Sequence, residues 1–305
     1  MLRFILIRLA QLPLIIAGTS LIVFVFLNAS GDPAQLLLPA EASAEEVAQL
    51  RQALGLDRSI FEQYLAFLSN AVRGDFGMSF RAHRPAMDVV LDALPATLEL
   101  ALAALLVATL ISIPLGVTAA VRRGGLADAA ATVVAVLGQS MPVFWLGIIL
   151  IMIFAVFLHW LPVSGRGGLA ALILPAVTLG WYMNALMTRL TRASMLEVLG
   201  EPFIRTARAK GLPERVVIFR HGFRNALVPI VTIWGLQAGT MLTGTVVTET
   251  VFAWPGVGRA SIYAVLGRDY PVVLASIAVF TLIFLAVNLV IDVAYFLIDP
   301  RIRRG

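Results

Sequence analysis

Cations interleaved with small side chains form the most distinctive chemical pattern in the chain. Cationic and small residues alternate up to a helix-breaking glycine in the series Arg205, Thr206, Ala207, Arg208, Ala209, Lys210, Gly211 and Leu212. Small side chains allow a partner to approach closely, and cations complement an acidic rim on that partner. The pattern therefore predicts a protein-docking surface. The alternative interpretation is an amphipathic helix that rests on anionic lipid.

The residues around this surface predict two short helices that meet at an angle. The stretch from Met195 to Lys210 favours a helix apart from Gly200 and Pro202, and Gly211 is suited to the left-handed conformation that ends one. Pro213 fits the first turn of a second helix that begins near Leu212, because proline needs no hydrogen-bond partner there. Both helices are expected to lie roughly parallel to the membrane surface.

Motifs for catalysis, nucleotide binding or metal binding are missing from the sequence. There is no Gly-x-x-x-x-Gly-Lys-Ser/Thr loop for ATP and no cysteine. His83, His159 and His221 are far apart and form no His-Glu-x-x-His pair. Gln139 and Ser140 lack the flanking glycines of a hydrolase elbow. We therefore expect no enzyme activity, no metal and no cofactor bound by this chain, and a membrane enzyme is disfavoured.

The composition is that of a multi-pass membrane protein. Hydrophobic residues make up 60% of the 305 residues and charged residues 13%, against about 45–50% and about 25% in soluble domains. Since a helix needs about 20 apolar residues to cross the hydrocarbon core, the sequence predicts an all-α membrane protein. Six spans are expected, at 9–28, 96–120, 131–158, 171–189, 228–250 and 273–297. The first is longer than the apolar core of a signal peptide, about 7–15 residues, and should be retained.

Basic residues predict that both ends of the chain lie in the cytosol. A net charge of +5 could suggest nucleic acid, but in a chain of apolar spans basic residues mark the cytosolic loops. Arginines gather before the first span, after the second, between the fourth and fifth, and after the sixth. The short loops on the other side hold only Arg166, Arg259 and Arg268. This N-in, C-in arrangement places the docking surface inside, with no nucleic-acid partner.

The chain divides into three regions: the N-terminus and first span at 1–28, an extracytoplasmic segment at 29–92, and a five-span core at 93–305 with a cytosolic loop at 190–226. In the extracytoplasmic segment, Ser43 followed by Glu46 is a capping-box pattern that predicts a helix ending near Gly55. Residues 61–72 have amphipathic spacing. They are expected to form a helix lying flat on the outer membrane surface.

Polar or adaptable side chains at membrane depth mark candidate positions for a solute pathway. They are Gln139, Ser140, Asn184, Thr188, Gln237, Thr240, Met241 and Asn288. Such residues usually face the interior of a helix bundle. A pathway lining is one interpretation, and hydrogen bonding between helices is the other. Asp292 lies near the cytosolic end and is expected to pair with a loop arginine.

Motifs along nearly the whole chain resemble one family. The docking region reads Phe203-x-Arg-Thr-Ala-Arg-Ala-Lys-Gly and then Arg220-His-x-x-Arg-Asn-Ala-Leu-x-Pro. Other motifs are Gly31-Asp-Pro, Leu54-Gly-Leu-Asp, Arg73-Gly-Asp-Phe-Gly-x-Ser, Leu94-Pro-Ala-Thr-Leu-Glu-Leu, Val251-Phe-x-Trp-Pro-Gly-Val-Gly-Arg, Arg268-Asp-Tyr-Pro-Val-Val and Asp299-Pro-Arg-Ile-Arg. In this order the set resembles permease subunits of binding-protein-dependent ABC importers, in particular the dipeptide, oligopeptide and nickel branch.

This resemblance implies a type I ABC importer permease in the bacterial inner membrane. It implies a homologous second permease subunit, two cytosolic ATPase subunits that carry ATP and Mg, and an extracytoplasmic substrate-binding protein. The solute would be a peptide, glutathione or a nickel chelate. Glu249 and Arg259, at the outer end, are candidates for contact with the binding protein, and a solvated salt bridge is the alternative.

The resemblance also assigns the docking surface a role as the coupling loop that inserts into a groove on an ATPase subunit. Closure of the ATPases would then tilt the helices between inward and outward access. The family pattern is Glu-Ala-Ala, three residues, then Gly. Ala207 and Gly211 match it, whereas Thr206 replaces the first alanine and Arg205 replaces the glutamate. Contacts made by that glutamate in relatives therefore do not carry over to Arg205.

The alternative function is a self-contained secondary transporter or channel. Such proteins often have inverted repeats and ionisable groups within the membrane. In this sequence no repeat is visible and the ionisable residues gather in the loops. The pattern therefore favours a subunit that is driven by another chain.

Overall fold

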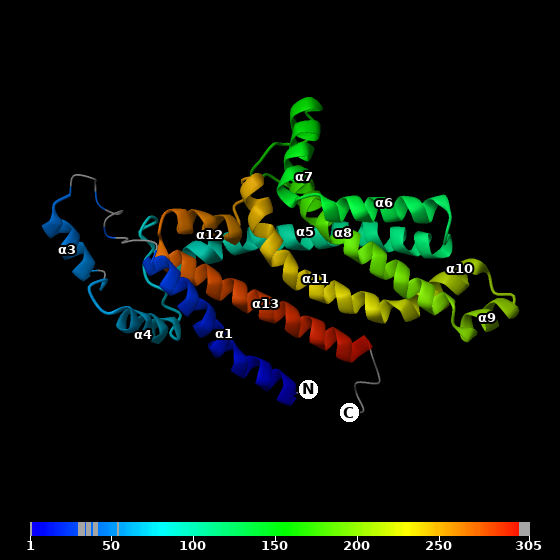
Figure 1. Cartoon of the computed structure of the whole chain (residues 1–305), viewed down its shortest axis with the longest axis horizontal. Coiled ribbons are helices and arrows are strands. Elements are labelled where there is room, and N and C mark those ends of the chain that lie inside the picture. The colour runs from blue at the N-terminus through cyan, green and yellow to red at the C-terminus, as the bar shows by residue number, and fades with distance from the viewer. Residues whose placement is uncertain (1, 30–33, 35–37, 39–41, 54, 299–305) are drawn as a thin grey trace. The chain divides into compact units, whose positions relative to one another are not determined.

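A computed structural model describes the chain except for residues 1, 30–33, 35–37, 39–41, 54 and 299–305. The predicted all-helical fold is confirmed: throughout the described part, β pairing is limited to an isolated bridge between Met78 and Pro85. The chain forms two compact units, and the colours of Figure 1 follow the residue number along it. The units comprise Met1–Thr97 with Pro255–Leu285, and Leu98–Trp254 with Ala286–Gly305. The three regions expected from the sequence, 1–28, 29–92 and 93–305, divide the chain by function rather than by packing. This division stays a prediction.

The first unit combines the N-terminal helices with part of the C-terminal ones. It contains α1 (Leu2–Ala29), α3 (Ala44–Ala53), α4 (Ile60–Ala71), the start of α5 (Ala86–Val121), α12 (Val257–Leu266) and most of α13 (Tyr270–Ile298). The predicted capping box before α3 is present, since Ser43 and Glu46 exchange hydrogen bonds. A second box, Ser59 with Glu62, starts α4. Each box satisfies backbone N–H groups that the first helical turn leaves unpaired.

Aromatic packing holds α4 against α1 within the first unit. The Tyr64 ring lies 5.6 Å from the Phe24 ring, centroid to centroid. Its hydroxyl donates to the Ala17 carbonyl at 2.5 Å and lies 3.1 Å from the Ser20 hydroxyl. The amphipathic helix predicted at 61–72 is thus present as α4, and its buried side contacts another helix of the protein.

A buried carboxylate links two of the sequence motifs. Asp269 is only 3% exposed, and it accepts hydrogen bonds from the Ser79 hydroxyl at 2.5 Å and the Phe80 N–H at 3.1 Å. An ionised carboxylate is costly to bury without such donors. Asp269 therefore ties the loop before α5 to the start of α13.

The second unit is built around one long helix, α8 (Leu169–Leu199). The other elements are the remainder of α5, α6 (Leu126–Ser140), α7 (Val143–Leu150), the π-helix η1 (Ile151–Phe157), α9 (Pro202–Ala209), α10 (Glu214–Val216), the π-helix η2 (Val217–Phe223) and α11 (Arg224–Val251). Helix α8 packs against α6, α7, α11 and η2, and Figure 1 shows α6 and α11 running alongside it. Its small and polar residues are largely buried, as expected for helices that approach closely.

Gly180 marks a close approach of α8 to α5. A Cβ atom added there would lie 2.6 Å from the Ala104 carbonyl oxygen, a backbone atom that cannot rotate away. Overpacking of a well-packed site typically costs about 1–3 kcal/mol. We expect Gly180→Leu to lower the yield of monodisperse protein in size-exclusion chromatography several-fold. The control is Gly18→Leu in α1, where an added Cβ meets nothing within 4 Å. Equal yields from the two variants would contradict the close packing.

Helices long and apolar enough to cross a membrane cover three of the six expected spans. Among the described residues they are Ala86–Val121, Leu169–Leu199 and Tyr270–Val290, matching the second, fourth and sixth. The first and fifth, 9–28 and 228–250, include side chains outside the described residues. The six-span, N-in, C-in arrangement therefore stays a prediction.

The third expected span, 131–158, is not one continuous helix. It is a pair, Leu126–Ser140 and Val143–Phe157, bent by 106°. The cause is Pro142, which disfavours helical geometry at Met141, and Met141 is accordingly extended, with φ −92 and ψ 125. The pair is a broken span or a re-entrant loop.

Candidate functional site

The predicted docking surface is built from α9 and the turn that follows it. Helix α8 stops at Leu199, and Gly200 and Glu201 separate it from α9, so the helical stretch is interrupted at the glycine and proline that the sequence marks as unfavourable. Pro202 begins α9 at a position where no N–H partner is needed. Gly211 takes the left-handed conformation, with φ +74, as predicted.

The second helix begins slightly later than predicted. Pro213 precedes it as the N-cap of α10, which continues directly into η2 and then into α11. The docking surface is therefore joined to α8 through two residues and to α11 through an unbroken helical path. A movement of α9 would act on both of these bundle helices.

Ala207 faces the protein rather than the open surface. It is 6% exposed and packs with Ile204, Val217 and Leu199 in an apolar cluster between α9 and η2. Its small side chain thus lets α9 approach η2, which differs from the predicted contact with a partner. The remaining predicted residues are exposed: Arg205, Thr206, Ala209, Lys210, Gly211 and Leu212.

Sequence reasoning missed an aromatic member of this surface. Phe203 precedes the cationic series and is 42% exposed. An exposed aromatic side chain among cations is typical of the anchor residues of protein interfaces. In the sequence, Phe203 directly precedes Ile204. Neighbouring positions of a helix lie on different faces, so Phe203 lies on another face of α9 than the buried Ile204.

An ion pair closes the turn between α9 and α10. The Arg208 guanidinium lies 2.7 Å from a Glu214 carboxylate oxygen, across Gly211. The hydrogen bond from Arg208 holds the pKa of Glu214 below its ordinary value. Both side chains are about half exposed, so the pair adds little stability, typically about 0–1 kcal/mol. Its effect is to restrain the angle of the turn.

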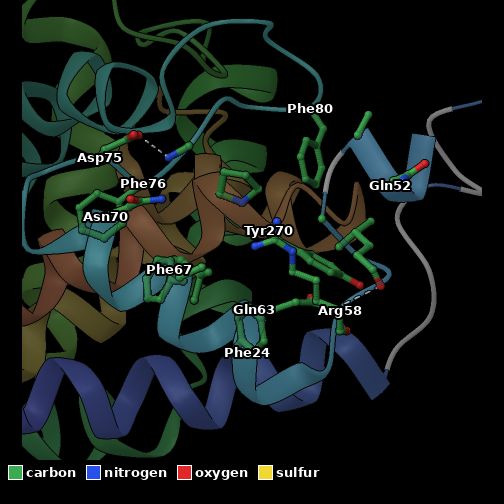
Figure 2. A pocket seen from close by; sticks show the side chains of 17 residues that line it. Phe24, Gln52, Arg58, Gln63, Phe67, Asn70, Asp75, Phe76, Phe80 and Tyr270 are labelled. Carbon is green, nitrogen blue, oxygen red and sulfur yellow. Dashed lines mark hydrogen bonds between the residues drawn. The ribbon is translucent and has the colours of Figure 1, made fainter. Parts of the chain in front are cut away.

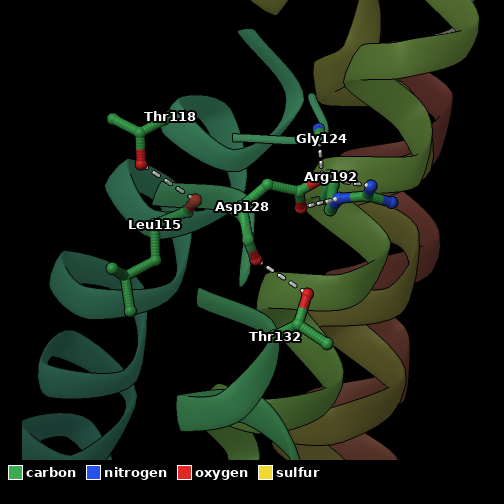
Figure 3. A network of polar contacts seen from close by, with 6 residues as sticks. All are labelled: Leu115, Thr118, Gly124, Asp128, Thr132 and Arg192. Carbon is green, nitrogen blue, oxygen red and sulfur yellow. Dashed lines mark hydrogen bonds and ion pairs between the residues drawn. The ribbon is translucent and has the colours of Figure 1, made fainter. Parts of the chain in front are cut away.

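A second ion pair connects α8, near the end that carries α9, to the start of α6 (Figure 3). The Arg192 guanidinium donates to both carboxylate oxygens of Asp128, at 2.6 and 2.8 Å. The Gly124 N–H donates to the same carboxylate at 3.0 Å. Because the Asp128 side chain is only 10% exposed, this bidentate contact is shielded from water. It joins α6, the preceding loop and α8 into one connected group.

The predicted pathway residues fall into two environments. Gln139 and Ser140 are exposed beside the Pro142 break, and Arg189 donates to the Gln139 side chain at 3.2 Å. Asn184 and Thr188 are almost completely buried in α8 and are hydrogen-bonded to each other at 3.0 Å. The first pair is placed where a solute could reach it. The second fits the alternative interpretation of hydrogen bonding within the bundle.

The other pathway candidates are less accessible. Met241 is 3% exposed, whereas Gln237 and Asn288 are partly exposed and make contacts of their own. The side chains of Thr240 and Asp292 lie outside the described residues. Whether any of these residues lines a pathway stays a prediction.

The two predicted outer docking residues differ in accessibility. Glu249 is completely buried in the second unit, which does not fit contact with a partner or a solvated salt bridge. Arg259, in the first unit, is partly exposed, and its guanidinium lies 5.3 Å from the centre of the Tyr263 ring. Arg259 alone remains a candidate for contact with a binding protein.

Comparison with known proteins adds relatives and structural neighbours. Residues 112–304 match the family described as "Binding-protein-dependent transport system inner membrane component". Residues 1–101 match "Binding-prot-dependent transport system membrane comp, N-term". The chain is 43% identical to the glutathione transport system permease protein GsiC of Escherichia coli strain K12, over 99% of each chain. It has the same identity and coverage with GsiC of Shigella flexneri serotype 5b.

Solved structures share the fold at low sequence identity. The chain resembles the MetNI methionine ABC transporter in an inward-facing conformation, with a TM-score of 0.60, 18% identity, and coverage of 70% of this chain and 97% of that one. An amino acid ABC transporter crystallised with histidines gives a TM-score of 0.52, 14% identity, and coverage of 68% and 93%. The two family matches and the 43% identity to GsiC establish that the chain belongs to the inner-membrane permease subunits of binding-protein-dependent ABC importers, in the peptide and nickel branch.

Proposed function

We propose that this permease forms, with a homologous second permease subunit, the pathway of an importer for peptides or a related small solute. The related small solutes include glutathione and nickel chelates. The observation that carries the proposal is 43% identity to a glutathione permease over 99% of both chains. A binding protein would deliver the solute at the outer face, and this chain would perform no catalysis.

The energy source in this proposal is a pair of cytosolic ATPase subunits that carry the ATP and Mg. The exposed surface of α9, from Phe203 to Leu212, is the contact proposed for one of them. The partners would prefer different conformations of the permease, so that ATP binding and hydrolysis shift the population between inward and outward access. The apolar cluster around Ala207 supports this role, because it packs α9 against η2 and so holds the surface in place.

Uptake into proteoliposomes tests this function. The complete complex, with binding protein outside and ATP inside, should accumulate glutathione or a dipeptide at least about tenfold above a sample without ATP. The same measurement on the lone chain, with an ion gradient and no ATPase, should give no uptake. Gradient-driven uptake by the lone chain would instead establish the secondary-transporter alternative.

A further inference from the structure

The first unit contains a cavity of about 390 Å³ that no part of the proposed function uses (Figure 2). Its walls come from α1, α3, α4, the loop before α5 and the start of α13. Ligand sites for small molecules typically have volumes of about 300–1,000 Å³ and apolar walls with a few polar groups. The cavity falls in this range, so the chemistry of its lining decides what it accepts.

Aromatic rings in two packed groups form a wall of this cavity. The rings belong to Phe24, Phe67, Phe76, Phe80 and Tyr270. Phe67 stacks on Phe24 at 6.4 Å and meets the edge of Phe76 at 5.9 Å, and Phe80 lies 6.4 Å from Tyr270. Because the rings already pack against one another, the wall is formed before a ligand arrives. It offers an apolar, polarisable surface for a side chain.

The polar side chains that line the cavity are charged groups and amides. Figure 2 shows Arg58 and Asp75 on opposite sides of the cavity, with aromatic rings between them. The Arg58 side chain is exposed and its charge acts on the Glu62 carboxylate, although the two form no ion pair within 4 Å among the described residues. One Asp75 oxygen accepts from the Gly77 N–H at 2.9 Å, which leaves the other for a ligand. Gln52 and Asn70 add amide groups that can donate and accept.

A side-chain amide in the cavity wall positions the backbone at Arg58. The Gln63 amide donates to the Arg58 carbonyl at 2.9 Å and the Leu56 carbonyl at 3.3 Å. It thus fixes the backbone that carries Arg58 to helix α4. The backbone on the cationic side of the cavity is therefore held to α4 by a side-chain amide that is partly exposed.

We propose that this cavity is a binding subsite for a short peptide on the outer side of the permease. The α-carboxylate would pair with Arg58, the amino group would pair with Asp75, and an apolar side chain would lie on the aromatic wall. A guanidinium binds a carboxylate through parallel hydrogen bonds, which favours this ligand over a neutral solute. The proposal rests on the proposed function and deepens it by naming a subsite and the peptide groups that it recognises.

The test uses the complete complex and paired variants. Arg58→Gln removes the carboxylate partner, and Arg73→Gln is its control, an exposed arginine of the same segment outside the cavity. Arg58→Gln should raise KM for uptake of a dipeptide about tenfold, the loss of about 1.4 kcal/mol of binding. KM for the same dipeptide with an amidated C-terminus should stay unchanged. Arg73→Gln should leave both KM values unchanged. Phe67→Ala should raise KM for both peptides, whereas Phe61→Ala, on the exposed side of α4, should not.

The outcomes separate this subsite from the proposed function. ATP-dependent uptake with the same KM in wild type and Arg58→Gln would overturn the subsite and leave the function intact. A complex without any ATP-dependent uptake would overturn the function, and calorimetric binding of the dipeptide to wild type and Arg58→Gln would then decide the subsite alone. If Arg58→Gln weakened only capture of the binding protein, the cavity would hold a side chain of that protein, and the subsite would be wrong.

Discussion

Asp128→Ala is expected to lower the melting temperature of the detergent-solubilised complex by several degrees and to reduce ATP-dependent uptake at least tenfold. The substitution leaves the Arg192 guanidinium without its bidentate partner and the Gly124 N–H without its acceptor. Removing one member of a shielded ion pair is destabilising because the other charge loses its partner. Arg192 keeps partial access to water, with 31% of its side chain exposed, which limits this cost.

The effect on uptake follows from the position of this pair. It connects α8, which carries the docking surface, to α6, which leads into the bend at Pro142. Without the pair, movement of α9 should reach α6 less effectively, so ATP hydrolysis should persist while uptake falls. Asp92→Ala is the control, because it removes an ion pair of similar length, 2.7 Å, whose side chains are exposed. Equal uptake by both variants would contradict a role for Asp128 in coupling.

Gly211→Trp is expected to abolish uptake while the protein remains in the membrane. The left-handed backbone at Gly211, φ +74, costs other residues about 1–2 kcal/mol, which a folded membrane bundle tolerates. A side chain added there meets no atom of this chain within 4 Å. It would project into the space proposed for the ATPase subunit, so the loss should appear as reduced co-purification of that subunit.

A second left-handed glycine provides the control for backbone strain. Gly165 has φ +87, and an added Cβ there also meets nothing within 4 Å. Gly165→Trp should therefore carry the same strain and leave both ATPase binding and uptake near the wild-type level. Wild-type uptake by Gly211→Trp would contradict the assignment of this turn as the contact with an ATPase subunit.

Local features of the fold were predictable because neighbouring residues determine them. The box at Ser43, the break at Gly211 and the helix at 61–72 each depend on side chains within a few positions of one another. Pro142 was also visible in the sequence, but the length of the apolar run around it favoured a single span. The angle of a bend depends on the elements that pack against it, and a local sequence pattern carries no information about these elements.

Long-range contacts in the site were not predictable from spacing. Asp128 pairs with a residue 64 positions away, and Asp269 with one 190 positions away. The inward orientation of Ala207 was missed for a related reason. Helix α9 is only 8 residues long, too short for apolar periodicity to show which side faces η2. Family motifs identify such residues without indicating what they contact.

Site-specific crosslinking on α9 tests the central claim that an ATPase subunit binds this surface and drives transport through it. The chain has no cysteine, so a single introduced cysteine carries a photoreactive maleimide at a unique position. Ala209→Cys lies on the exposed side of α9, and Ala207→Cys lies on its buried side. In the transport-active complex we predict that illumination joins position 209 to an ATPase subunit and that position 207 gives far less of this product. Adducts of position 209 with lipid alone, in a complex that still transports, would contradict the account.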